Sequence, residues 1–143
     1  MVALDTNILV YAADRASPFH LPARELVTGL AERPEPWALP WPCIYEFLRT
    51  ITGRAITPPM PPDLAWANAQ GLIQSPGARL LSETQRHAAV LEQVLRDSGA
   101  TGSLLHDAHI AALCIEHGVS ELVTADRDFR RFRGLRIHDP FHE

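Results

Sequence analysis

The chain has 143 residues, of which 46% are hydrophobic and 21% charged, as in a soluble globular protein of ordinary domain size. No uncharged apolar run approaches the ~18 residues of a membrane span, and Asp5 and Asp14 interrupt the segment where a signal peptide would need an unbroken apolar core. The formal net charge of −4 argues against a generally basic nucleic-acid-binding surface. We therefore expect a single domain over residues 1–143, located in the cytoplasm and not in a membrane.

The first predicted element is a short buried strand that ends at Asp5, because Leu4 is flanked by small and β-branched residues. A carboxylate in such an apolar stretch costs several kcal/mol unless a partner neutralises it. Asp5 could simply cap the turn that follows. Its place at the end of a strand equally suits a ligand-binding role.

Two helices are predicted next, and each has a proline near its start. Ser17-Pro18 begins a helix over about 18–32, and Pro42 begins a second helix that carries Glu46 and ends before Gly53. The later helices and strands follow from apolar spacing, capping residues and prolines. They comprise strands at 37–39, 79–81, 121–125 and 135–137, a proline-rich surface loop at 56–62, and helices over about 63–75, 84–97 and from Ser103 to Gly118.

Short strands that alternate with helices predict parallel β-α units and an α/β domain. Ligands of such sheets bind beyond the carboxyl ends of the strands. Asp5 and Asp126 each follow a predicted strand, so we expect them to meet at one edge of the sheet.

Four acids stand where a surface acid is less expected: Asp5, Glu46, Asp107 and Asp126. Each has a structural alternative, as a cap (Asp5), an exposed helix acid (Glu46), a partner of the helix dipole (Asp107) or the opening of a turn (Asp126). Carboxylates that converge on one pocket repel one another unless a cation is present. All-oxygen sites suit Mg²⁺ or Mn²⁺, so the sequence predicts a divalent-metal site for phosphoryl chemistry.

Four segments occur in order along the chain: Leu4-Asp5-Thr6-Asn7-Ile8-Leu9, Glu46, His106-Asp107-Ala108-His109 and Thr124-Ala125-Asp126-Arg127-Asp128-Phe129. In these segments the sequence resembles the PIN-domain ribonucleases, and in particular the VapC-type toxins of bacterial toxin–antitoxin pairs, and the resemblance covers essentially the whole chain. It implies a PIN-like α/β/α sandwich with a central parallel sheet of about four to five short strands. It also implies a metal-dependent endoribonuclease that hydrolyses RNA phosphodiester bonds.

The same resemblance implies a role for each site residue. Asp5 and Asp107 would be the most direct ligands of Mg²⁺, for which Mn²⁺ is a plausible substitute, and Glu46 and Asp126 would hold the metal or its waters. Asn7 and Thr124 would orient the carboxylates by hydrogen bonds. Asp128 could assist, although a purely structural role in its turn is the preferred interpretation.

Partners follow from the resemblance and from one local charge cluster. The family implies an RNA substrate, a cognate antitoxin protein and a homodimer. Aromatic residues including Trp37, Trp41 and Phe47 could line the antitoxin groove, or could simply be core residues. The arginine-rich segment after Asp126, with Arg127, Arg130 and Arg131, could grip backbone phosphates or could be a solvated face.

Two alternatives remain open at this point, and a third is disfavoured. The domain could bind RNA or protein without turnover. His106 and His109 are three residues apart and could belong to a zinc site, although no third ligand is evident. A phosphatase that uses an aspartate nucleophile would need a catalytic lysine, and the chain contains no lysine.

The two cysteines, Cys43 and Cys114, are expected to be buried thiols.

Overall fold

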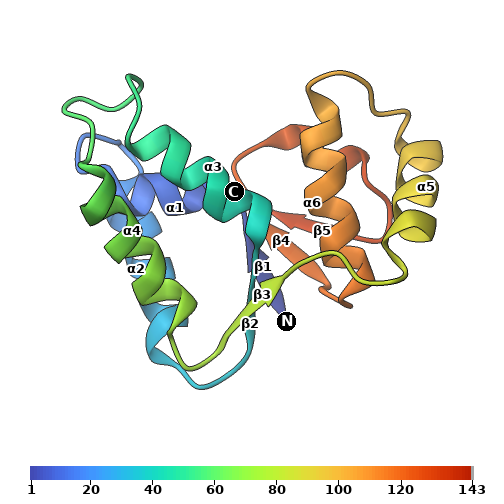
Figure 1. Ribbon diagram of the computed structural model, residues 1–143, viewed down its shortest axis with the longest axis horizontal. Helices are drawn as coiled ribbons and strands as arrows, with labels where there is room; N and C mark the ends of the chain where they lie inside the picture. Colours follow the sequence, from blue (N-terminus) through green and yellow to red (C-terminus); the bar gives the residue numbers. More distant parts are fainter. Residues whose placement is uncertain (143) are drawn as a thin grey trace.

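In the computed structural model, which describes residues 1–142, five parallel strands form one sheet in the order β3-β2-β1-β4-β5 (Figure 1). The strands are β1 (Val2–Leu4), β2 (Trp37–Pro40), β3 (Ala78–Leu81), β4 (Glu121–Val123) and β5 (Arg136–His138). The helices are α1 (Thr6–Ala13), α2 (His20–Glu32), α3 (Trp41–Ile51), α4 (Pro62–Ile73), α5 (His87–Ser98) and α6 (Leu104–Glu116), with a short 3₁₀ helix η1 (Arg127–Arg131).

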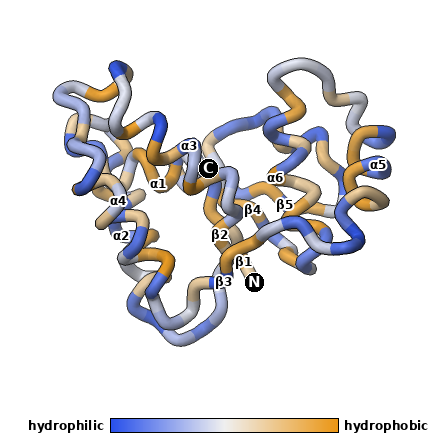
Figure 2. Tube along the Cα trace, in the orientation of Figure 1, coloured by the Kyte–Doolittle hydropathy of each residue, from blue (hydrophilic) through white to orange (hydrophobic). Residues whose placement is uncertain are grey.

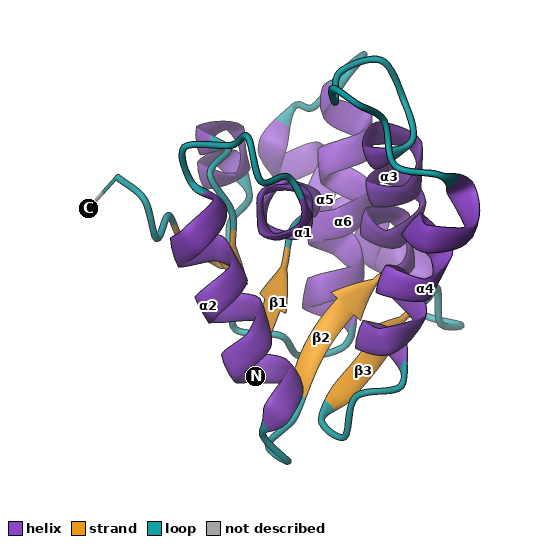
Figure 3. Ribbon diagram, turned by 90° about the vertical axis from the view of Figure 1, so that its left-hand side faces the viewer, coloured by secondary structure: helices purple, strands orange, loops and turns teal. Residues whose placement is uncertain are grey.

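Helices cover both faces of the sheet, which confirms the predicted α/β/α sandwich. Figure 1 shows α1 to α4 on one side of the strands and α5 and α6 on the other, and Figure 3 looks from the α1 to α4 side. Successive strand residues point to opposite faces. Ala3 and Leu122 therefore pack with α6, whereas Leu4 and Val123 pack with α1 and α3. Hydrophobic residues concentrate along the central strands accordingly (Figure 2).

Helix α1 was not predicted from the sequence. It is only eight residues long, and Asp5 caps it by accepting a hydrogen bond from the Thr6 amide at 2.7 Å. Its buried face consists of Ile8, Leu9 and Val10, a pattern that equally suits the continuation of an apolar strand. The cap predicted as one alternative for Asp5 is therefore present.

Two of the predicted helices begin later than expected because local hydroxyl groups close turns before them. Ser17 Oγ accepts from the Phe19 amide at 3.1 Å, and α2 begins at His20. Thr84 Oγ1 accepts from the Arg86 amide at 3.1 Å, and α5 begins at His87, three residues after the predicted start. Such side-chain bonds offer the backbone an alternative to helix.

Other local predictions are confirmed. Cys43 and Cys114 are free buried thiols. Gly118 follows α6 with φ +71°, a left-handed conformation that favours glycine. Within residues 1–142, no helix is both long and apolar enough to cross a membrane.

The sheet has a topological switch point between β1 and β4. The chain proceeds from β1 to β2 and β3 on one side and later places β4 and β5 on the other. Leu4 lies opposite Val123 in the parallel register, and the Asp5 amide donates to the Val123 carbonyl at 3.0 Å. Residues that follow these two strands therefore meet at the carboxyl edge, where open α/β sheets bind ligands.

Candidate active site

Asp5 is the most buried of the predicted site acids, with 5% of its surface exposed. Its Oδ1 accepts from the Thr6 amide, and its Oδ2 accepts from Thr124 Oγ1 at 2.7 Å. The Cys43 thiol also donates to Oδ1 at 3.7 Å. Burial raises the pKa of Asp5 despite these hydrogen bonds. These hydrogen bonds hold the carboxylate in one orientation, but none of them comes from a positively charged group that would offset its charge.

Thr124 and Asn7 form the supporting hydrogen bonds that the resemblance implied. The fully buried Thr124 hydroxyl donates to Asp5 and accepts from Asn7 Nδ2 at 3.2 Å and from the Asp126 amide at 3.0 Å. Asn7 Oδ1 in turn accepts from the Ala125 amide at 3.3 Å. These bonds tie the start of α1 to the segment after β4.

Asp107 and Asp126 come together from distant parts of the chain, and Asp128 joins them. Carboxylate oxygens of the three residues lie within 4.8 Å of one another. Burial raises the pKa of Asp107 to about 6, and the charges of Asp126 and Asp5 add to the effect. Asp126 also opens a turn, the structural alternative considered for it, because its Oδ1 accepts from the Asp128 amide at 2.9 Å and caps η1.

Glu46 lines the same pocket as Asp5, Asp107 and Asp126, a hollow of about 320 Å³. It is half-buried on α3 and forms an ion pair with Arg49, one turn further along the helix. The hydrogen bond and charge of Arg49 lower the pKa of Glu46. Glu46 is therefore the one member of the quartet that already has a cationic partner within residues 1–142.

His106 also lines this pocket, and it does not join His109 in a metal site. His109 instead contacts Glu83, and the potential metal ligands grouped with it are Glu83 and His87. Within residues 1–142, the alternative of a zinc site that combines His106 with His109 is therefore not supported.

The acidic pocket suits a hard divalent cation. Among residues 1–142, no arginine forms an ion pair with Asp5, Asp107 or Asp126, although their carboxylates approach one another. Burial and mutual repulsion make the charged forms costly without a cation. The donors are oxygens, which Mg²⁺, Mn²⁺ and Ca²⁺ prefer to softer ligands.

The arginine-rich segment lies next to this pocket along the chain. Arg127, Arg130 and Arg131 on η1 are all exposed, while Phe129 anchors the same short helix in the core. The segment thus presents positive charge to solvent directly after Asp126.

The sequence favoured a structural role for Asp128, whereas the structure brings its carboxylate close to those of Asp107 and Asp126. The sequence did not identify Glu83 or His87. For Asp128, the signal available was its spacing of two residues from Asp126. No local pattern identifies Glu83 or His87, because they are brought to His109 only by the packing of α5 on α6.

A parallel sheet with acids gathered at its switch point is the arrangement of the PIN domain. The family model of the PIN domain matches residues 2–135 of the chain. The chain therefore belongs to this family. Its sequence relatives are VapC ribonucleases, so it belongs to the VapC-type group. It is 36% identical over 138 residues to Ribonuclease VapC48 of Mycobacterium tuberculosis, covering 96% of this chain and 95% of that protein. It is 37% identical over 141 residues to Ribonuclease VapC43 of the same species, covering 98% and 95%.

Solved structures show the same fold. FitAcB from Neisseria gonorrhoeae aligns over 100% of both chains with a TM-score of 0.67 and 19% identity. VapBC2 from Rickettsia felis, bound to a DNA fragment from its promoter, aligns over 96% of this chain and 98% of that chain with a TM-score of 0.65 and 17% identity.

Proposed function

We propose that the chain is a divalent-metal-dependent endoribonuclease, the toxin of a toxin–antitoxin pair, and that the acidic pocket is its catalytic centre. The observation that carries the proposal is the convergence of Asp5, Asp107 and Asp126 at the switch point of the sheet. The relatives named VapC ribonucleases, which match nearly the full chain, supply the substrate class.

Asp5 and Asp107 would hold Mg²⁺ most directly, and Asp126 and Glu46 would hold it or its waters. Mn²⁺ accepts the same oxygen ligands. When bound, such a cation would supply Lewis-acid stabilisation of negative charge on the phosphate and would lower the pKa of water. Thr124 and Asn7 keep the Asp5 carboxylate oriented, and Asp128 adds a further negative group at the rim.

Cleavage of a structured RNA by the full-length protein tests this function. We expect new RNA ends with Mg²⁺ present, none with excess chelator, and recovery when Mg²⁺ is added beyond the chelator. The reaction is followed by gel separation of end-labelled RNA. Arg96→Ala, on the exposed face of α5, serves as the matched control and should cleave like the parent. Equal cleavage with and without chelator would overturn the proposal, and RNA binding without new ends would favour a binding module.

Removing the positive charge of η1 should weaken RNA binding. We expect the triple change of Arg127, Arg130 and Arg131 to Ala to lower the affinity for RNA. The slope of log binding constant against log salt concentration should become shallower by ~0.7 for each phosphate that an arginine no longer neutralises. Binding is measured in chelator, so that the RNA stays intact, at several salt concentrations. Arg79→Ala removes an exposed arginine elsewhere and should leave the slope unchanged. If the triple variant keeps the parental slope, the segment is only a solvated face.

An antitoxin is the proposed protein partner, since the solved relatives include a VapB–VapC pair. A hollow of about 200 Å³ between α1, α2, α3 and α4 could take an apolar segment of it, with Phe47 and Leu9 in its lining. Trp37 cannot line any such groove, because it is fully buried in the core, and that part of the expectation is wrong. The homodimer and the cytoplasmic location stay predictions.

A further inference from the structure

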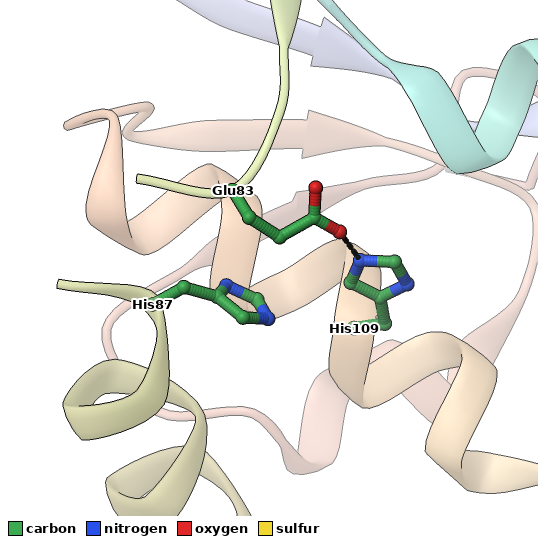
Figure 4. Close-up of side chains that lie close together, drawn as sticks. All are labelled: Glu83, His87 and His109. Atoms are coloured by element: carbon green, nitrogen blue, oxygen red, sulfur yellow. Dashed lines mark hydrogen bonds and ion pairs between the residues drawn. The ribbon is translucent and has the colours of Figure 1, made fainter. Parts of the chain in front are cut away.

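A second cluster of potential metal ligands lies outside the acidic pocket. Glu83 follows β3, His87 is the first residue of α5, and His109 is on α6. One ligand atom from each lies within 4.8 Å of the others. Figure 4 shows the three side chains directed toward a common space between the loop and the two helices.

The buried carboxylate of Glu116 fixes the orientation of His87. The Glu116 side chain has no exposed surface, and its Oε1 bonds His87 Nδ1. Its Oε2 accepts from the Thr84 hydroxyl at 2.6 Å and from the Thr84 amide at 3.0 Å. With Nδ1 engaged, Nε2 of His87 points toward Glu83 and His109 (Figure 4). A histidine that binds a metal through one ring nitrogen usually donates a hydrogen bond from the other nitrogen to a carboxylate, which fixes the orientation of the ring.

Glu83 and His109 already meet, with 2.6 Å between Glu83 Oε1 and His109 Nε2. The His87 and His109 rings are 5.6 Å apart between centroids. In a tetrahedral zinc site the ligand atoms are about 3.3 Å apart, given bonds of ~2.0 Å. The three atoms lie within 4.8 Å of one another, and the side chains of Glu83 and His109 are exposed enough to rotate as the atoms close to that spacing. The partial exposure of His109 leaves a fourth position open to water.

We propose that Glu83, His87 and His109 form a zinc site distinct from the acidic pocket. Two imidazoles and one carboxylate, with water as the fourth ligand, suit Zn²⁺, whereas the acidic pocket offers hard oxygens only. Asp107 and His109 are two residues apart on α6 and therefore point to different sides of the helix. Zinc bound here holds the loop after β3 and the start of α5 against α6, the helix that carries Asp107.

Titration of ZnCl₂ into the full-length protein, in excess Mg²⁺ to occupy the acidic pocket, tests the site. Bound zinc is measured by competition with a chromophoric chelator, and the melting temperature by circular dichroism. We expect one zinc per parent chain and a higher melting temperature when it is bound. Replacing a residue that only hydrogen-bonds a metal ligand lowers metal affinity by about 10–100-fold. His109→Gln and Glu83→Gln each remove a ligand itself, so each variant should bind zinc at least about tenfold more weakly.

His20→Gln is the matched control, since it removes a histidine of α2 that lies outside both the cluster and the lining of the acidic pocket. It should bind zinc with parental affinity. Glu83 and His109 are partly exposed, so their variants should keep the parental circular dichroism spectrum. Parental affinity in both variants, or no zinc bound by the parent, would show that the three residues form an ion-pair network only. Either result leaves the assignment of the acidic pocket untouched.

Discussion

Asp107→Asn is expected to abolish metal-dependent RNA cleavage and, at pH 7 without metal, to make the protein more stable. Both effects have the same origin. The carboxylate is partly buried beside Asp126 and Asp5, so its charge is costly until a cation offsets it. Asparagine has a similar shape and no charge, and it removes the repulsion together with a metal ligand. A substitution that raises stability and removes activity together marks a residue whose native charge is costly to the fold.

The stability gain should depend on pH in a defined window. The pKa of Asp107 is raised from 3.8 to about 6 in the folded protein, so between these values the folded state binds more protons than the unfolded state. Stability of the metal-free parent therefore falls as pH rises from about 4 to about 6. The advantage of Asp107→Asn should grow over the same range and then stay constant, at roughly 1–2 kcal/mol after allowance for solvent screening.

Urea unfolding of the metal-free parent and variant at pH 4, 5, 6 and 7 measures this difference, and end-labelled RNA measures cleavage. Asp97→Asn is the control, because Asp97 is exposed on α5 and accepts a hydrogen bond from Gln93, a neutral residue of the same helix. Its effect should stay within about 0.5 kcal/mol at every pH. A variant that cleaves at the parental rate, or that is less stable at pH 7, would contradict the role given to Asp107.

Thr124→Val is expected to lower both stability and activity. The hydroxyl is fully buried and serves Asp5, Asn7 and the Asp126 amide simultaneously. Valine has a similar volume but leaves all three groups without their partner, at a cost of about 1–3 kcal/mol. Because Asp5 Oδ2 loses the Thr124 hydroxyl that helps to orient it, we expect cleavage to slow by about 10–100-fold.

Thr124→Ser keeps the hydroxyl and is the matched variant. It should recover most of the cleavage rate, with a modest loss of stability from the missing methyl group. The apparent Mg²⁺ affinity distinguishes this positioning role from simple destabilisation, since it should fall for Thr124→Val and be retained for Thr124→Ser at a temperature where both are folded. If serine and valine behave alike, the hydroxyl does not position Asp5.

Features governed by local sequence could be predicted, and features that depend on packing could not. Strand ends with acids, proline-initiated helices and the Gly118 stop all follow from nearby residues. Helix α1 was missed because its short buried run, Ile8 to Val10, has the same composition as a strand. The approach of Asp107 to Asp126 and Asp128, and the meeting of His87 with His109, depend on how distant segments pack.

The length of β1 constrains the site as firmly as the identity of Asp5 does. Leu4 faces one layer of helices and Ala3 the other, and only the pairing of Leu4 with Val123 brings Asp5 beside Thr124. Adding or deleting one residue before Asp5 would exchange the two faces of the strand or shift its pairing. We therefore expect volume-conserving apolar substitutions within β1 to be tolerated better than a change in its spacing from Asp5, because the core and the site depend on the same alignment.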